Sequence, residues 1–156
     1  MANVPNMLEG LKAMMAKRKG EKSIACFVDG PNIIRKELGI DLEKVRKSLG
    51  KHGKLKVAKV FLDQYASDKL IEAVTNQGFD PVVVPSDVDV ALAVEAIEAC
   101  FNDNIDVIAI VSRDSDFKPV VMKAKERGKE TIVAGCEPDF SSAVRNAADI
   151  VINLKE

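Results

Sequence analysis

Six short apolar runs recur along the chain, and stretches with apolar residues at helical spacing separate most of them. The runs are Ile24–Asp29 (IACFVD), Val57–Leu62 (VAKVFL), Pro81–Pro85 (PVVVP), Val107–Ser112 (VIAIVS), Thr131–Gly135 (TIVAG) and Ile150–Leu154 (IVINL). Their β-branched composition is typical of strands that are buried on both faces of a parallel sheet. Because helical stretches alternate with these strands, the pattern predicts parallel βαβ units joined by right-handed crossovers. The expected fold is therefore an α/β three-layer sandwich around a mainly parallel central sheet of five or six strands.

Capping and stop residues mark where helices begin and end between these runs. Helices are expected at Ser67–Gln77, Asp89–Phe101, Phe117–Arg127 and Phe140–Asn146. Ser67 caps the first of them, and Gly78 and Gly128 stop the first and third. The region Ile33–Gly50 is expected to hold one or two helices broken near Gly39, with Asp41 as the cap of the second.

Apolar residues also repeat at helical spacing near the N-terminus, at Val4, Met7 or Leu8, Leu11 and Met15. This pattern predicts an amphipathic helix that is too short and too charged for a membrane span or a secretory signal. Two interpretations stay open, since the helix packs either on its own domain or against a second copy in a homodimer. The expected organisation is an N-terminal helical extension, residues 1–22, and one domain, residues 23–156, in a cytoplasmic protein without membrane contact.

The supply of metal-binding and nucleophilic side chains narrows the chemistry. His52 is the only histidine, which excludes Ser-His and Cys-His nucleophile pairs and every histidine-based zinc or iron site. Cys26, Cys100 and Cys136 are far apart among apolar neighbours and are expected to be buried free thiols. Carboxylates must therefore carry the chemistry, and a metal ion bound by oxygen ligands alone would be Mg²⁺ or Mn²⁺.

Several carboxylates follow the ends of the predicted strands, where open parallel sheets bind their ligands. They are Asp29 after the first strand, Asp87 and Asp89 after the third, and Asp114 and Asp116 after the fourth. Taken singly, Asp89 or Asp116 is a helix cap and Asp29 is a turn residue. Taken together, carboxylates from three segments at one edge repel one another unless a cation lies between them. The sequence therefore favours a cation site.

Charge is divided unevenly along the chain. Up to Lys59 there are 14 Lys and Arg against 6 Asp and Glu, and from Val60 onward there are 9 against 18. The densest basic segment, Arg35–Lys59, includes Arg46, Lys47 and Lys51 and is expected to contact the phosphates of a nucleic acid. The alternative is an ordinary solvated surface. Base stacking on an aromatic sheet face is not expected, because the six Phe and one Tyr lie mostly at core-like positions.

Four motifs in order make the chain resemble the NYN domain, in its LabA-like branch, which belongs to the PIN-like nuclease superfamily. The motifs are FVDGPNI at Phe27–Ile33, DVDVALAVEA at Asp87–Ala96, VSRDSDFKPVVMKAKERGK at Val111–Lys129 and AADIVI at Ala147–Ile152. The resemblance implies a metal-dependent nuclease that acts on RNA. It places the acidic residues of the family pattern on Asp29, Asp89, Asp114 and Asp116, and its asparagine on Asn32.

The chain departs from this family pattern at two places. Relatives usually carry Lys-Gly before the Val-Asp-Val triplet and an aspartate six residues after its Asp, where this chain has Ser86, Asp87 and Glu95. Six residues are about 600° of helix, so Glu95 projects about 120° from Asp89 and is not expected to contact the same ion. The second departure is Arg113, which stands where the pattern commonly has Gly and would add a phosphate contact or narrow the pocket.

These observations predict a Mg²⁺- or Mn²⁺-dependent ribonuclease, with single-stranded DNA as an open alternative substrate. Its metal would be held by Asp29, Asp89, Asp114 and Asp116, while Asn32, Ser112, Arg113 and the basic residues would bind substrate. One rival is an RNA-binding or regulatory module with the same fold and no turnover. Another is a phosphoryl-handling domain, but Pro31 stands where a haloacid-dehalogenase-like phosphatase needs its second aspartate. A receiver domain would need paired acids where Cys26–Gly30 offers only Asp29.

Overall fold

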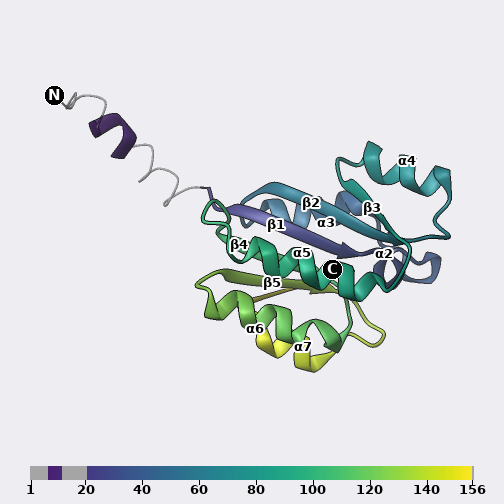
Figure 1. Cartoon of the computed structure of the whole chain (residues 1–156). Coiled ribbons are helices and arrows are strands. Elements are labelled where there is room, and N and C mark those ends of the chain that lie inside the picture. The colour runs from purple at the N-terminus through teal and green to yellow at the C-terminus, as the bar shows by residue number, and fades with distance from the viewer. Residues whose placement is uncertain (1–6, 12–20, 156) are drawn as a thin grey trace.

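The computed structural model describes residues 7–11 and 21–155 of the chain (Figure 1). Within residues 21–155, one sheet of six parallel strands has the order β3-β2-β1-β4-β5-β6. The strands are β1 (Ser23–Asp29), β2 (Lys54–Asp63), β3 (Asp80–Val84), β4 (Val107–Val111), β5 (Glu130–Gly135) and β6 (Ile150–Asn153). All six predicted strands are confirmed, with ends that differ from the prediction by three residues at most.

The helices between these strands cover both faces of the sheet. They are α2 (Gly30–Ile33), α3 (Leu42–Gly50), α4 (Asp68–Asn76), α5 (Val88–Ala99), α6 (Lys118–Glu126) and α7 (Ser142–Ala147), with 3-10 turns η1 (Lys36–Leu38) and η2 (Ser115–Phe117). Asp41 and Ser67 cap α3 and α4 as predicted, and Gly39, Gly78 and Gly128 have positive φ where helical segments end. Figure 1 shows α5, α6 and α7 on one face of the sheet and α3 on the other.

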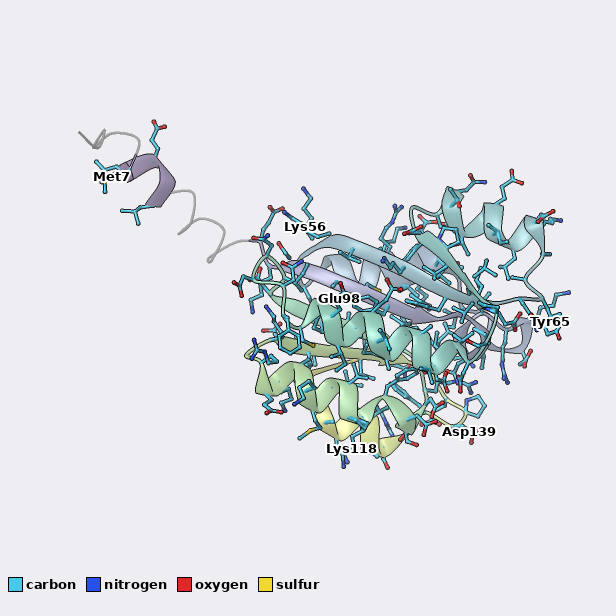
Figure 2. All side chains as sticks on the ribbon, viewed as in Figure 1. Met7, Lys56, Tyr65, Glu98, Lys118 and Asp139 are labelled. Carbon is cyan, nitrogen blue, oxygen red and sulfur yellow. The ribbon has the colours of Figure 1, made fainter. Side chains whose placement is uncertain are left out.

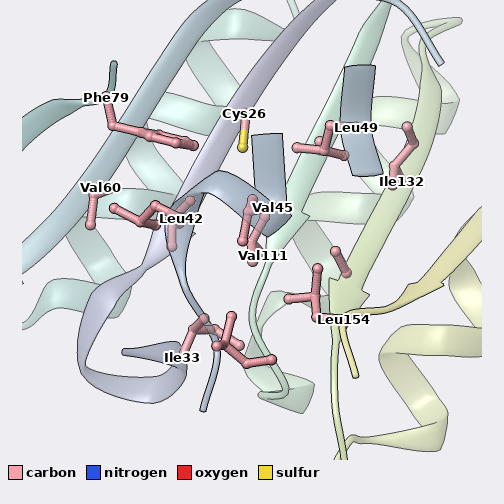
Figure 3. Packing of buried hydrophobic residues seen from close by; sticks show 14 of the residues in the cluster. Cys26, Ile33, Leu42, Val45, Leu49, Val60, Phe79, Val111, Ile132 and Leu154 are labelled. Atoms are coloured by element: carbon pink, nitrogen blue, oxygen red, sulfur yellow. The ribbon is translucent and has the colours of Figure 1, made fainter. Parts of the chain in front are cut away.

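Alternation along β1 divides the interior into two apolar cores. Ile24, Cys26 and Val28 face the first core, which α3 and α4 complete with residues such as Val45, Leu49 and Val74. Figure 3 shows Cys26, Val45 and Leu49 in this core. Ala25 and Phe27 face the second core, which α5, α6 and α7 cover. By the same alternation, Asp29 lies on the side of α5 at the end of the strand.

The strand order reverses at β1, which leads to β2 on one side and pairs with β4 on the other. In open parallel sheets such a switch point opens a crevice at the carboxyl ends of the strands. Gly30, the first residue after β1, is needed for the tight turn there. A Cβ on Gly30 would stand 2.4 Å from the carbonyl oxygen of Phe61 in β2. The sharp exit of the chain from β1 therefore depends on glycine.

Part of the predicted N-terminal helix is described. Residues 7–11 are helical, and Met7, Leu8 and Leu11 are each more than half exposed. The remainder of the predicted helix, including Val4 and Met15, lies outside the described residues. The homodimer contact stays a prediction.

The three cysteines are free and buried, as predicted. Burial raises the pKa of the Cys26 thiol to about 12, so this group is inert at neutral pH. No helix within the described residues combines the length and the apolar character that a membrane crossing requires.

Asp149, the residue before β6, is hydrogen-bonded to Thr131 of β5. Its carboxylate accepts bonds from the backbone N–H and the hydroxyl of Thr131, at 2.9 and 3.0 Å, and its own N–H donates to that hydroxyl at 3.0 Å. Thr131 is buried, and these bonds, the backbone one first, lower the pKa of the Asp149 carboxyl below 3.8.

We expect Asp149→Ala to lower the free energy of unfolding by about 2 kcal/mol, because a buried donor pair loses its acceptor. A lowered folded-state pKa stabilises the protein above the unfolded value and loses this effect as the pH falls. Denaturant unfolding of the wild type and the variant should therefore differ most at neutral pH, and the difference should decrease as the pH falls through the lowered pKa of Asp149. The exposed Asp103→Ala variant is the control. Equal stability of Asp149→Ala and wild type at pH 7 would show that the hydrogen bonds between Asp149 and Thr131 do not stabilise the protein.

Candidate metal centre

Asp29 is a buried carboxylate at the end of β1, and only 3% of its surface is exposed. The Ser112 hydroxyl donates a hydrogen bond to its Oδ2 at 3.0 Å, and the Asn32 backbone N–H also favours the charged form. Burial nevertheless raises the pKa of Asp29, and the nearby Asp114 adds to this effect. Hydrogen bonds thus hold the Asp29 carboxylate in place, but they do not fully compensate its negative charge for the loss of water.

Two further carboxylates join Asp29 from elements that are distant in sequence. Asp114 follows β4 and Asp89 is the second residue of α5, and both are partly buried. One carboxylate oxygen from each of Asp29, Asp89 and Asp114 lies within 4.8 Å of the other two. We call this set the acidic triad. It brings together three of the four aspartates that the sequence predicted as metal ligands.

Mutual repulsion is the main electrostatic feature of the acidic triad. The pKa of Asp89 is raised to about 6, first by burial and then by Asp29, Asp114, Asp87 and Asp116. A carboxyl with this pKa retains a proton well above the usual range for aspartate. A divalent cation would replace that proton and remove the repulsion.

The donor chemistry of the acidic triad fits a hard divalent cation. All three side chains offer carboxylate oxygens, one buried and two partly buried, and no histidine or cysteine belongs to the group. Such oxygen ligands suit Mg²⁺ and Mn²⁺, which commonly keep several waters and use few carboxylates. The residues present therefore fit the group that the sequence predicted.

Asp87 and Asp116 lie outside the acidic triad. The Asp87 carboxylate accepts the backbone N–H of Asp89 at 2.9 Å and is the cap of α5. Asp116 is exposed and lies outside the group of three, and its N–H donates to Asp114 Oδ1 at 2.9 Å. The cap of η2 is therefore Asp114, which serves as a cap and as a triad member together. The role of Asp116 as a metal ligand stays a prediction.

A second network beside the triad is built from Arg113 and Asn32. Arg113 is 6% exposed, and its three side-chain nitrogens each donate to an internal oxygen. Nε reaches Asn32 Oδ1 at 3.2 Å, Nη2 reaches the Asn32 carbonyl at 3.0 Å, and Nη1 reaches the Pro138 carbonyl at 2.6 Å. The Arg113 backbone N–H also donates to Asn32 Oδ1, at 2.9 Å.

This network holds three loops at one edge of the sheet, those that follow β1, β4 and β5. The guanidinium charge also lowers the pKa of Asp29, opposing the effect of burial. The sequence predicted Asn32, Ser112 and Arg113 as substrate contacts. In the structure, Asn32 Oδ1, the Ser112 hydroxyl and the Arg113 guanidinium have internal partners that position the triad.

Glu95 is turned away from the triad. Its carboxylate accepts a hydrogen bond from Lys59 Nζ of β2 at 2.6 Å, and both side chains are about 30% exposed. This agrees with the helical angle, which placed Glu95 about 120° from Asp89.

The predicted basic contacts lie on α3, which covers the face of the sheet opposite α5. Lys44, Lys47 and Lys51 line one shallow hollow along α3, whereas Arg46 points to Gly78 near the end of α4. Helix α3 begins near the carboxyl edge of the sheet and leads into β2 at the amino edge. Figure 2 shows Lys56 at the end of the sheet opposite Tyr65 and Asp139. The lysines therefore form a stripe that leads away from the triad.

Beside Asp114, the crevice at the switch point is a hollow of about 420 Å³. Its walls include Asn32, Arg113 and Asp114, with Arg35, Glu37, Asp139 and Ser141 at its border. The sequence predictions did not single out Asp139 or Ser141, because they follow β5, to which no ligand had been assigned. The rule that ligands lie at the carboxyl ends of strands would have found them if it had been applied to β5.

Comparison with known proteins defines the class. Residues 23–155, which hold the sheet and the acidic triad, match the NYN domain. The chain therefore belongs to the NYN domain family. Its placement in the LabA-like branch stays a prediction.

One relative and one solved structure extend the comparison. The chain is similar to an uncharacterized protein of Methanocaldococcus jannaschii, with 58% identity over 140 residues, which are 90% of this chain and 58% of that protein. A crystal structure of a protein of unknown function from Vibrio parahaemolyticus has the same fold, with a TM-score of 0.76 and 21% identity over 86% of this chain and 94% of that one.

We expect Arg113→Ala to lower the free energy of unfolding by about 2 kcal/mol, because the backbone carbonyls of Asn32 and Pro138 lose their guanidinium donors. Mn²⁺ should still raise the melting temperature, since the three carboxylates remain, but by less than in the wild type, because the loops that carry them lose their shared partner. Thermal melts with and without Mn²⁺ measure both quantities. If Arg113 instead bound phosphate from solvent, the variant would keep its stability and lose only affinity for nucleic acid.

Proposed function

We propose that this protein is a metal-dependent ribonuclease that hydrolyses phosphodiester bonds at the acidic triad. The observation that supports this function most directly is the convergence of Asp29, Asp89 and Asp114 within 4.8 Å at the switch point of an NYN domain. Mg²⁺ or Mn²⁺ bound there would supply Lewis-acid activation of a water and stabilise the leaving oxygen.

The role that each residue would take in this reaction follows from how buried its side chain is. Asp29 is the fixed ligand, because Ser112 and the Asn32 backbone orient its carboxylate. Asp89 and Asp114 are partly exposed and border the side from which substrate approaches. Asp116 would hold an outer water or a second cation. Arg35, half exposed above the turn after β1, would contact a phosphate.

A second candidate is an RNA-binding module without turnover. Two observations favour it: Arg113 occupies a position where the family pattern commonly has Gly, and Glu95 is paired with Lys59 instead of reaching the triad. Incubation of labelled RNA with the protein and Mn²⁺ separates the two functions. Product that requires the metal supports the nuclease, whereas binding without product supports the module.

The role of Asp114 is tested by Asp114→Asn. An Asn side chain can accept the cap bond from Asp116, so the substitution removes a negative charge and keeps the cap. The metal-free variant should be as stable as the wild type or more stable, because repulsion in the triad falls. A cation at about 100 times its Kd stabilises the wild type by roughly 2.7 kcal/mol, and the variant should lose most of this gain together with cleavage.

Asp41→Asn is the matched control, because Asp41 caps α3 by a 2.7 Å bond and does not belong to the triad. It should retain both the Mn²⁺-dependent rise in melting temperature and the cleavage. If Asp114→Asn keeps the full Mn²⁺ response, the triad is not the metal site.

The predicted basic contacts on α3 are tested by the triple variant Arg46→Ala, Lys47→Ala and Lys51→Ala. We expect weaker binding to RNA of unrelated sequences and a smaller salt dependence, with the slope reduced by about 0.7 for each lost single-strand contact. Lys47 and Lys51 should account for most of the change, because Arg46 points toward Gly78. Affinity measured over a range of salt concentrations gives the slope. An unchanged slope would mean that α3 is a solvated surface.

A further inference from the structure

The turn after β1 separates two hollows at the carboxyl edge of the sheet. Asn32 borders the hollow beside Asp114, and Gly30 and Pro31 border a second hollow of about 390 Å³. Because Gly30 directly follows Asp29, the second hollow opens at the same edge of the sheet as the acidic triad. It lies on the α4 side of the sheet, whereas Asp29 lies on the side of α5. Its other wall belongs to the segment that joins β2 to α4.

Tyr65 forms part of that wall and is 84% exposed. Its backbone is fixed, since the Tyr65 N–H donates to Asp63 Oδ1 at 2.9 Å and the Ala66 N–H donates to the Asp63 carbonyl at 3.2 Å. Figure 2 shows Tyr65 at the same end of the molecule as Asp139, which borders the hollow beside Asp114. An aromatic ring is therefore presented to solvent at the edge where the triad lies.

The surroundings of Tyr65 suit a flat ligand with an adjacent negative charge. Leu62 and Leu70 give the hollow an apolar lining. Arg35, which borders the hollow beside Asp114, donates from Nε to the Pro31 carbonyl at 2.9 Å. Its side chain is 50% exposed, and its Nη1 lies 3.9 Å from the exposed carboxylate of Glu37. Because Pro31 borders the second hollow and Arg35 borders the hollow beside Asp114, their hydrogen bond holds a cationic group over the turn between the two hollows.

We propose that this hollow binds one unpaired base of a single-stranded nucleic acid by stacking on Tyr65, with Arg35 contacting the phosphate that leads to the triad. The inference rests on the proposed function and adds its substrate class. Every base has a π-face, so stacking on Tyr65 tolerates any sequence. A paired base is stacked within its own helix and is not available to the ring. The site therefore selects single strands over duplexes.

Tyr65 provides its own spectroscopic probe, because the chain contains one Tyr and no Trp. Tyrosine fluorescence thus reports on this one ring. Binding is measured in the Asp114→Asn background, so that a short single-stranded RNA is not consumed. We expect the RNA to quench the fluorescence and the same sequence in a duplex to leave it unchanged.

Substitutions then separate the ring from its hydroxyl. Tyr65→Ala should weaken binding of the single strand by about tenfold or more, and Tyr65→Phe should restore the affinity. Phe101→Ala is the matched control, because Phe101 is 58% exposed and follows α5 at the other edge of the sheet, where the Arg127 guanidinium lies 4.3 Å from its ring centre. It should bind RNA as the parent protein does. Melting temperatures verify that each variant is folded.

Three results would overturn the stacking site. Unchanged affinity in Tyr65→Ala, or equal losses in Tyr65→Ala and Tyr65→Phe, would exclude stacking on the ring. If the protein with Asp114 intact still cleaves RNA in Mn²⁺, the proposed nuclease survives such a result. Absence of both RNA binding and cleavage would reject the nuclease and the stacking site together.

Discussion

The burial of the Asp29 carboxylate at the switch point is the constraint on which the rest of the site depends. A charged group that is 3% exposed must be compensated by hydrogen bonds, by opposite charge or by a cation. Ser112, the Asn32 backbone and Arg113 supply part of this compensation, yet the pKa of Asp29 remains raised. Asp89 and Asp114 increase the negative charge instead of reducing it. The three carboxylates therefore repel one another, and this repulsion destabilises the folded protein until a bound cation removes it.

The residues around Asp29 show how the fold keeps such a site in place. Ser112 donates to Asp29 and accepts from the Asp114 N–H at 3.2 Å, so one hydroxyl joins the ends of β1 and β4. Arg113 extends this connection to the loop after β5 through the Pro138 carbonyl. A buried arginine with carbonyl and amide partners fixes the loops around the carboxylates. The positions of the triad and of the hollow beside Asp114 are consequently coupled.

The division of charge along the chain acquires a spatial meaning in the fold. The acidic triad lies on the α5 side of the sheet, and the lysine stripe lies along α3 on the opposite face. Arg35 borders the same hollow as Asp114 and is bonded to Pro31, which borders the second hollow. A single strand that crosses the edge at Arg35 and continues along α3 would contact both Arg35 and the lysine stripe. The basic segment therefore has two distinct parts: Arg35, at the edge of the sheet where the triad lies, and the lysine stripe, which is remote from the triad.

The sequence by itself determined the strands, most helix ends and which side chains are available for chemistry, because these depend on composition and on neighbouring residues. β-Branched runs indicate strands, Asp41 and Ser67 supply caps, and a chain with one histidine must rely on carboxylates. Only the tertiary structure decided which strands are adjacent, and hence that Asp29, Asp89 and Asp114 meet while Asp116 remains exposed. It also decided that the Arg113 guanidinium bonds internally and that Tyr65 lies open beside the turn after β1. The physical reason is that periodicity records which side of an element is buried, whereas side-chain partners are set by packing between segments distant in sequence.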